Sequence, residues 1–203
     1  CDDADWKGRA KGQPFFAQVQ LRGGKNRNTK HGTDPAKVTL PPYYPDHPVL
    51  RKDWAAYLNS WVQTDLEVDA ILKRLEAEGL ADSTVVFFWT DHGVSHARGK
   101  QFLYEEGIRV PLIVKWPGVV KPASKCTVPV ISTDFYPTIL AMSGLAQRPE
   151  QHLDGKNIVP LLKQDENIGR DAIYWHYPNY IGAGHPGGAR PCSVIRRGDW
   201  KLI

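Results

Sequence analysis

The chain has 203 residues, of which 41% are hydrophobic and 24% charged; this composition fits one large globular domain, or one domain with an appendage, and argues against general disorder. Its 26 lysines and arginines against 22 acidic residues give a net charge of +4, which by itself is too small to indicate a nucleic-acid-binding protein. The three cysteines include no CxxC pair, so a disulfide framework and a zinc ribbon are excluded.

The first half of the chain contains one predicted strand, one long helix and a second strand. Residues 15–21 are an apolar β-type run that follows a proline, which predicts a buried strand, and the basic residues 22–34 predict a loop. Residues 51–79 carry apolar side chains at three- and four-residue steps and end on a glycine, which predicts a helix. Residues 84–89 are almost continuously apolar, the pattern of a strand covered on both faces, and are far shorter than the ~20 residues of a transmembrane segment.

The second half of the chain also alternates between predicted strands and helices. The patterns predict a strand over residues 108–116, a helix over residues 134–142, a short strand over residues 172–175 and a hairpin within residues 194–203. A helix that leads directly into a strand is half of a parallel α/β layer. The sequence therefore predicts an α/β fold with a mixed, mostly parallel sheet flanked by helices.

A carboxylate and an imidazole, Asp91 and His92, directly follow the predicted strand 84–89. In open α/β sheets ligands bind beyond the carboxyl ends of the strands, so both side chains can reach one cation or one reacting group. The structural alternative is that Asp91 caps the next turn and Gly93 permits it. Lys100 and other cations follow within nine residues of Asp91; such a run suits an oxyanion held beside a metal, or else forms a solvated basic loop.

The stretch DHGxxxxxGKxxxYEEGIRVPLIVKWPG, residues 91–118, resembles the second signature region of the type I sulfatases, which belong to the alkaline-phosphatase-like superfamily. Three further stretches agree in order: PFF at 14–16, DFYPTIL at 134–140 and RRGDWKLI at 196–203. The resemblance implies that residues 1–170 are a sulfatase α/β domain lacking its N-terminal part, and that residues 171–203 begin a small C-terminal antiparallel subdomain. It also implies hydrolysis of sulfate esters on a sulfated small molecule or glycan, in the periplasm or outside the cell.

The resemblance implies a role for individual positions. Asp91 and His92 match the pair that binds the active-site Ca²⁺; hard oxygen ligands suit this ion, so the softer His92 either ligates it or instead holds the sulfate or orients a ligand. Lys100 matches the lysine that contacts the substrate sulfate during catalysis. His176 and His185 match a loop that faces the pocket and contacts substrate, or are ordinary surface histidines.

Several family features are missing or altered. The family nucleophile is a formylglycine made from the cysteine of C-x-P-S-R, and none of the three cysteines here has that context; Cys192 has the arginine spacing but no proline. The family's first metal-binding Asp-Asp pair follows an apolar strand, whereas Asp2-Asp3 follows none. We interpret the chain as a piece of a longer protein whose formylglycine and remaining Ca²⁺ ligands lie upstream, so the piece alone is expected to be inactive.

Lys25 falls at the position of a family histidine that contacts the sulfate ester. A lysine there can hold a sulfate oxygen during catalysis but is a poor acid at neutral pH unless its pKa is lowered, so His31 is an alternative acid. Two other functions stay open: a phosphodiesterase or phosphonate monoester hydrolase of the same superfamily, and a non-catalytic sulfated-glycan-binding domain. The glycan-binding domain would use the cations Lys25, Arg27, Lys30, Arg98 and Lys100.

Overall fold

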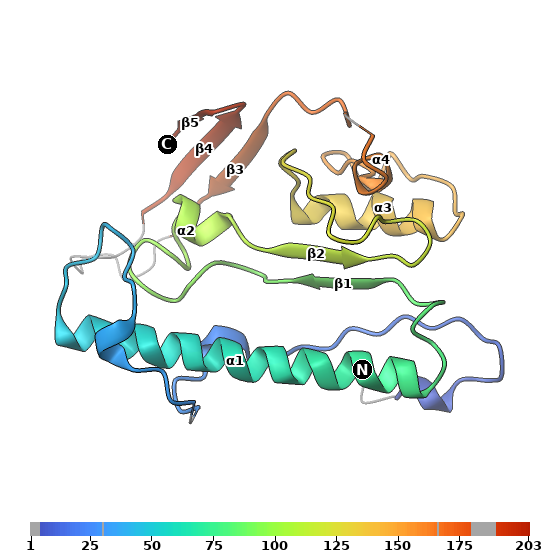
Figure 1. Ribbon diagram of the computed structural model, residues 1–203. Coiled ribbons are helices and arrows are strands. Elements are labelled where there is room, and N and C mark those ends of the chain that lie inside the picture. Colours follow the sequence, from blue (N-terminus) through green and yellow to red (C-terminus); the bar gives the residue numbers. More distant parts are fainter. Residues whose placement is uncertain (1–4, 30, 166, 180–189) are drawn as a thin grey trace. The chain divides into compact units, whose positions relative to one another are not determined.

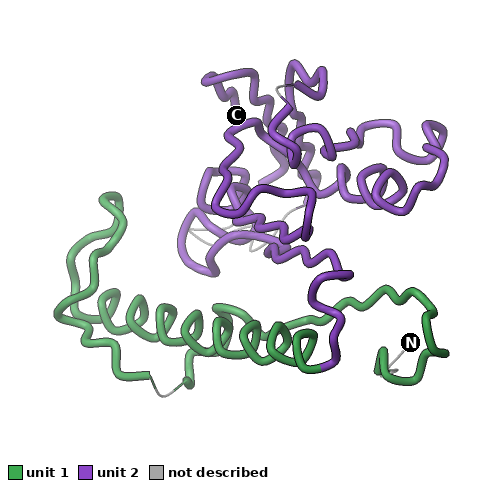
Figure 2. Tube along the Cα trace, turned by 45° about the vertical axis from the view of Figure 1, so that its right-hand side comes forward, with its two compact units in different colours: residues 1–77 green, residues 78–203 purple. Residues whose placement is uncertain are grey.

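The computed structural model describes residues 5–29, 31–165, 167–179 and 190–203. The chain forms two compact units, residues 1–77 (unit 1) and residues 78–203 (unit 2), which are coloured separately in Figure 2. The predicted boundary at residue 170 concerns a whole protein and stays a prediction. None of the helices among the described residues is long and apolar enough to cross a membrane.

Unit 1 is built around the long helix α1 (Pro48–Ala77), which confirms the helix predicted over residues 51–79 (Figure 1). Two short 3₁₀ turns, η2 (Gly23–Lys25) and η3 (Pro35–Lys37), pack against it, and η1 (Trp6–Gly8) precedes them. The helix buries a row of small or polar side chains together with one large apolar side chain near its end: Ala55, Asn59, Ser60, Thr64 and Leu75.

The strand predicted over residues 15–21 is absent from unit 1. This segment has no regular structure, and its Phe16 side chain is 77% exposed. A β-type sequence forms a strand only where a neighbouring strand supplies hydrogen-bond partners, and no other strand occurs among the described residues of unit 1. The apolar pattern was therefore insufficient, because the pairing partner decides the outcome.

Unit 2 begins with a two-stranded sheet of β1 (Val86–Trp89) and β2 (Leu112–Lys115). The strands pair antiparallel, with Phe88 opposite Ile113. The strand predicted from residue 108 starts only at Leu112: residue 108 ends the one-turn helix α2 (Glu105–Ile108), and residues 109–111 have no regular structure. The connection between the two strands, residues 90–111, contains only this one-turn helix and not the long crossover helix that usually joins parallel strands.

The C-terminal part of unit 2 is a three-stranded antiparallel sheet, in the order β3 (Ile173–Tyr177), β4 (Cys192–Arg197) and β5 (Trp200–Leu202). Gly198, with φ +56°, makes the tight turn of the predicted hairpin. This sheet confirms the expected small antiparallel subdomain. All strand pairs among the described residues are antiparallel, so the mostly parallel sheet expected from the helix–strand order is not formed by this part of the chain.

The core of unit 2 contains a fully buried carboxylate, Asp134, at the end of η4 (Ser132–Asp134). It accepts hydrogen bonds from the backbone N–H groups of Ile131 and Lys156, each at 2.8 Å, and from both terminal nitrogens of Arg170. The next helix α3 (Phe135–Met142) confirms the helix predicted over residues 134–142 and lies beside α4 (Val159–Leu162) (Figure 1). Asp134 and the groups that hydrogen-bond to its carboxylate are called here the Asp134 cluster. They give the DxxP segment, residues 134–137, a structural role.

Candidate active site

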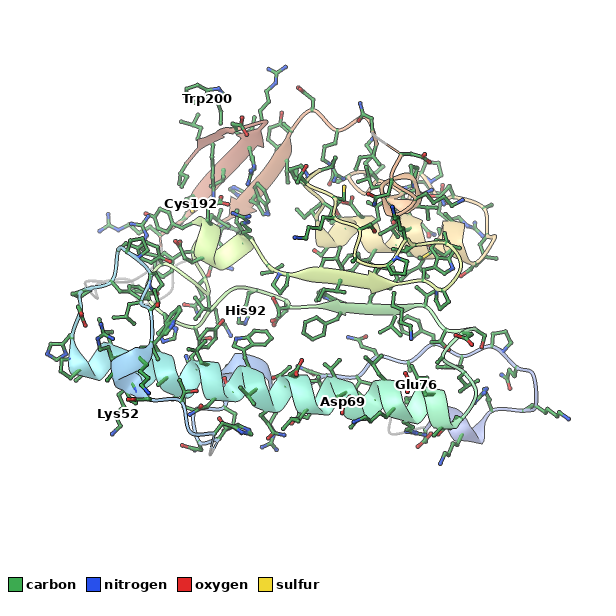
Figure 3. The ribbon with its side chains drawn as sticks, viewed as in Figure 1. Lys52, Asp69, Glu76, His92, Cys192 and Trp200 are labelled. Carbon is green, nitrogen blue, oxygen red and sulfur yellow. The ribbon has the colours of Figure 1, made fainter. Side chains whose placement is uncertain are left out.

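The two predicted metal-binding side chains lie together at the start of the site loop, defined as residues 90–111 between β1 and β2. The Asp91 side chain is 82% exposed, and His92, labelled in Figure 3, is 30% exposed. Asp91 Oδ1 accepts a hydrogen bond from the backbone N–H of His92 at 3.0 Å, so part of the predicted turn-capping role is also present. The second oxygen, Oδ2, lies 3.5 Å from His92 Nε2.

The hydrogen bond of the imidazole determines which nitrogen faces Asp91. His92 Nδ1 lies 2.8 Å from the Gly93 carbonyl oxygen, and because a carbonyl only accepts, Nδ1 carries the proton. In the neutral ring Nε2 is then a lone-pair atom beside a carboxylate oxygen, an arrangement that a proton or a cation between them stabilises. Two ligands at right angles and ~2.4 Å from one Ca²⁺ are ~3.4 Å apart, which matches the observed 3.5 Å.

Asp91 and His92 alone would be too few ligands for the predicted calcium site. Ca²⁺ takes ~6–8 oxygen ligands, and no group of three or more His, Cys, Asp or Glu residues gathers within the described ranges. The geometry of the pair therefore fits two neighbouring ligand positions of the predicted site, which needs further oxygen ligands to be complete.

Backbone contacts fold the site loop tightly around this pair. The Gly93 N–H donates to the Gly107 carbonyl oxygen at 3.0 Å, and the Lys100 N–H donates to the Val94 carbonyl oxygen at 2.7 Å. A Cβ atom at Gly93 would overlap the Glu106 carbonyl group, and one at Gly107 would overlap backbone carbonyl oxygens of the same loop. Only glycine fits at these two positions, so the glycines of the motif are required by the close backbone approach.

Lys100 lies in a constrained part of the site loop. Two residues near it, Arg98 at φ +65° and Gln101 at φ +78°, adopt the left-handed conformation, which costs about 1–2 kcal/mol for a residue with a side chain and persists only where the surroundings enforce it. The Arg98 guanidinium lies 4.2 Å from the centre of the Tyr104 ring. The structure gives Lys100 no side-chain ion pair with another described residue, and its convergence with Asp91 stays a prediction.

The other candidate residues of unit 2 lie in the C-terminal sheet or outside the described residues. His176 lies on β3, is exposed, and has its Nδ1 2.8 Å from Ser193 Oγ on β4. His185 lies outside the described residues, as do Asp2 and Asp3. Cys192 lies in the strand β4, as predicted. The family nucleophile stands at the start of a helix, so the position of Cys192 does not match it.

Lys25 belongs to unit 1 and lines a hollow of about 470 Å³ together with Gln20, Leu21, Arg22 and Asn26. The loop is held against α1 because Arg27 pairs with Asp53 at 3.2 Å and lies 5.1 Å from the centre of the Tyr57 ring. The alternative acid His31 has its Nε2 3.3 Å from Gln63 Oε1. Two cations and two amides around one hollow are suitable groups for binding the oxygens of an anion.

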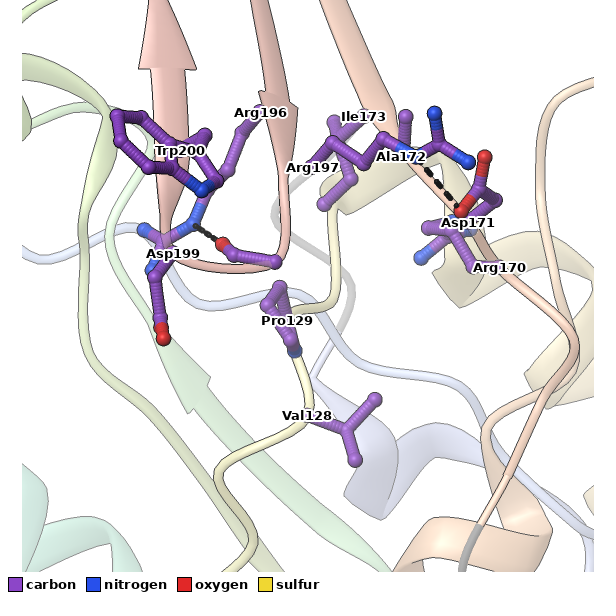
Figure 4. A pocket seen from close by; sticks show the side chains of 11 residues that line it. Val128, Pro129, Arg170, Asp171, Ala172, Ile173, Arg196, Arg197, Asp199 and Trp200 are labelled. Atoms are coloured by element: carbon purple, nitrogen blue, oxygen red, sulfur yellow. Dashed lines mark hydrogen bonds and ion pairs between the residues drawn. The ribbon is translucent and has the colours of Figure 1, made fainter.

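A larger hollow, about 710 Å³, lies at the β4–β5 turn and beside β3 (Figure 4). Three arginines line it, but each is already paired: Arg170 with Asp134, Arg197 with Asp171 at 3.0 Å, and Arg196 with Glu105 at 3.4 Å. An anion entering here would compete with an existing carboxylate at every guanidinium. Its size alone therefore does not make it the candidate active site.

Glu105 is a residue of the site loop to which the sequence assigned no role. Its Oε1 accepts a hydrogen bond from Lys201 Nζ at 2.9 Å, and its Oε2 lies 3.4 Å from Arg196 Nη1. The Lys201 hydrogen bond, aided by the nearby charges of Lys201, Arg196 and Arg109, holds the pKa of Glu105 below its usual value. The two motifs YEEG and RRGDWK contain these charges, but only the fold shows that they meet.

Comparison with known proteins gives two family matches. The model described as "Sulfatase" matches residues 4–145, and the model described as "N-sulphoglucosamine sulphohydrolase, C-terminal" matches residues 92–203. Among curated proteins, the chain is 29% identical over 130 residues to an ulvan-active sulfatase of Formosa agariphila, a match that covers 64% of this chain and 22% of that protein. The chain thus spans less than a quarter of that relative.

Two solved structures also resemble this chain, and each resemblance covers less than half of the solved chain. A protein solved in complex with its substrate D-glucosamine-2-N,6-O-disulfate superposes with a TM-score of 0.63 at 27% identity, covering 78% of this chain and 33% of that one. A phosphonate monoester hydrolase from Silicibacter pomeroyi also gives a TM-score of 0.63 at 21% identity, covering 91% of this chain and 40% of that one. The second likeness, at this identity, shows the fold alone.

Proposed function

Because the chain belongs to the sulfatase family and has its alkaline-phosphatase-like fold, we propose that the whole protein hydrolyses sulfate esters of a sulfated glycan. The observation that carries this proposal is the sulfatase match over residues 4–145, which includes the entire site loop with Asp91, His92 and Lys100. The chain covers 22% of the first relative's length, so the activity is assigned to the whole protein.

Sulfated glucosamine is the substrate class that we infer. The family description for residues 92–203 and the bound substrate of one structural neighbour both name an N-sulfated glucosamine. This inference is finer than the sulfatase assignment and can fail independently of it.

Within this mechanism the residues of the chain bind and polarise the sulfate group. The Lys100 ammonium would donate to a sulfate oxygen and stabilise the charge that develops on the group as its ester bond breaks. Asp91 and His92 Nε2 would provide two of the ligands of Ca²⁺, whose Lewis acidity polarises the same oxygens. The family's formylglycine would supply the nucleophile from a part of the protein outside this chain.

We extend the proposal to three further cations or potential cations. Lys25, with Arg22 beside it in the same hollow, would hold a second sulfate oxygen during catalysis through its ammonium group. His176 and His185 would contact the sugar from the C-terminal subdomain, as the family resemblance implies. The protonating acid for the leaving alcohol is left between Lys25 and His31.

The test is sulfate release by the intact protein, supplied with Ca²⁺, from glucosamine 6-sulfate, N-sulfoglucosamine and a phosphonate monoester, measured by ion chromatography for sulfate and by chromogenic release for the phosphonate. Sulfate release from glucosamine 6-sulfate supports the proposal. Release from N-sulfoglucosamine alone would show cleavage of a sulfamate S–N bond and would replace ester hydrolysis with sulfamate hydrolysis. Turnover of the phosphonate ester alone would replace it with the phosphoryl-transfer alternative. Binding of the sulfated sugars without turnover would favour the non-catalytic glycan-binding domain.

A further inference from the structure

We propose that Glu105 is a positioning residue that joins the site loop to the β3–β5 sheet through Lys201 and Arg196, and so holds Asp91, His92 and Lys100 in their working arrangement. Its role in turnover rests on the proposed sulfatase function, whereas its role in ordering the site loop does not. The proposal makes the C-terminal sheet a support of the candidate active site.

The first step of the argument is the geometry of the ion pairs. Arg196 and Lys201 are direct cross-strand partners in β4 and β5, so their side chains leave the same face of the sheet next to each other. Two adjacent cations repel, and the two oxygens of Glu105 separate them by pairing with one each, at 2.9 Å to Lys201 and 3.4 Å to Arg196. Lys201 is also the most buried of the three side chains, with 16% exposed.

The second step leads from Glu105 to the candidate site. Glu105 is the first residue of α2, and its carbonyl oxygen accepts the Arg109 N–H at 2.8 Å, which closes the turn. The backbone of this turn is in direct contact with the residue after His92: Gly107 accepts the Gly93 N–H at 3.0 Å, and the Glu106 carbonyl fills the space where a Gly93 Cβ would lie. Any shift of α2 must therefore move Gly93, and with it the adjoining Asp91–His92 pair.

The third step compares the expected effect on stability with the expected effect on turnover. An ion pair in which one partner is 42% exposed contributes little to global stability. Misplacing catalytic groups by about 1 Å, in contrast, costs up to ~10²-fold in rate. Loss of Glu105 should therefore change the order of the site loop and the turnover far more than the folding of the protein.

The experiment uses the intact protein and the isosteric variant Glu105→Gln. We expect kcat/KM on a sulfate ester to fall about 10-fold, mainly through kcat, because a displaced site loop weakens contacts made in the transition state. Amide hydrogen exchange at Gly93 and Lys100 should become about 10-fold faster while the melting temperature stays nearly unchanged. The matched control is Asp171→Asn, which breaks the exposed Arg197–Asp171 pair on the same sheet without touching α2, and should change neither measurement.

Variants of Lys201 test the Glu105–Lys201 ion pair directly. Lys201→Met should reproduce the effect of Glu105→Gln, the double variant should be no worse than either single one, and Lys201→Arg should restore most of the activity because it keeps the charge. Unchanged exchange and kcat in Glu105→Gln, equal effects in Asp171→Asn, or additive losses in the double variant would each overturn the proposal. If the parent protein releases no sulfate, the proposed function fails, and the exchange measurements still decide the role of Glu105.

Discussion

Two aspartates of unit 2, Asp134 in its core and Asp91 in its site loop, show how one side chain serves structure or chemistry according to its surroundings. Asp134 is 0% exposed and accepts four hydrogen bonds, two from backbone N–H groups and two from Arg170. Asp91 is 82% exposed and has the Oδ2 oxygen next to His92 Nε2. A carboxylate with all its lone pairs engaged has none for a ligand, so only Asp91 is suited to bind a cation.

The two regions also differ in what holds them. Side chains hold the Asp134 cluster, since Thr138 Oγ1 donates to the Asp134 carbonyl at 2.6 Å and accepts the Ile158 N–H at 3.0 Å. Backbone groups and glycines hold the part of the site loop around Asp91 and His92, and the Glu105 side chain ties its α2 turn to the β3–β5 sheet. A loop fixed through its backbone leaves its side chains available for substrate and metal, which is the arrangement that a preorganised site needs.

The largest effect should follow from breaking the Asp134 cluster. Asp134→Asn in the intact protein removes the charge but keeps the shape, and leaves the Arg170 guanidinium almost buried without its counter-ion. Breaking a buried pair in this way costs about 3–5 kcal/mol, measured as the loss of unfolding free energy in urea. Asp171→Asn, which breaks an exposed Arg–Asp pair, is the control and should cost less than ~1 kcal/mol. Equal losses for the two variants would contradict the structural role of Asp134.

The next effect should be on activity alone. Lys100→Ala in the intact protein should lower kcat/KM on a sulfate ester about 10²-fold or more, as removal of one electrostatic stabiliser of a transition state does, with no measurable change in the urea midpoint. Lys121→Ala, a change at an exposed lysine outside the site loop, should leave the kinetics unchanged. Normal kinetics in Lys100→Ala would remove this lysine from the active site and weaken the roles carried over from the family.

A smaller effect is expected where the site loop is packed most closely. A methyl group at Gly107, introduced by Gly107→Ala, would overlap the carbonyl oxygens of Gly99 and Phe102, and overpacking of this kind typically costs about 1–3 kcal/mol. The urea midpoint and kcat should fall together, because the same carbonyls position the loop. Gly118→Ala offers a comparison, since that glycine has open space around it and only its φ of +74° opposes a side chain.

The sequence predicted best what depends on local pattern or on a long motif. The helix over residues 51–79 and the hairpin within residues 194–203 are confirmed, because periodicity and a turn glycine are properties of the segment itself. The strand over residues 15–21 was wrong, since a strand depends on a partner. The alkaline-phosphatase-like fold class is confirmed. The strand pairs within the described residues are antiparallel, because the order of helices and strands does not reveal which strands lie next to each other.

The candidate site divides in the same way. The family motif placed Asp91, His92 and Lys100 on one loop, and the structure puts the first two 3.5 Å apart. The sequence motif could not give Glu105 a role, because its partners Lys201 and Arg196 lie 96 and 91 residues further along the chain. Long-range ion pairs leave no periodic signal, so only the fold could reveal this contact.

The smallest effect is a pH dependence of stability that comes from Glu105. Its pKa is held below the ordinary 4.5 by the Lys201 hydrogen bond, so the folded state binds a proton less readily than the unfolded state does. The stabilisation is therefore fully present above about pH 4.5 and is lost as the pH falls through the lowered folded-state pKa. Because Glu105 is 42% exposed, it should amount to less than ~1 kcal/mol.

Urea unfolding of the parent and of Glu105→Gln, from about pH 7 to about pH 3, measures this effect directly. The parent should be slightly more stable at neutral pH, and the difference should shrink towards zero below about pH 4.5. A gap between parent and Glu105→Gln that stays constant to low pH would mean that the Glu105 charge adds nothing, and that the contact with Lys201 acts through shape alone.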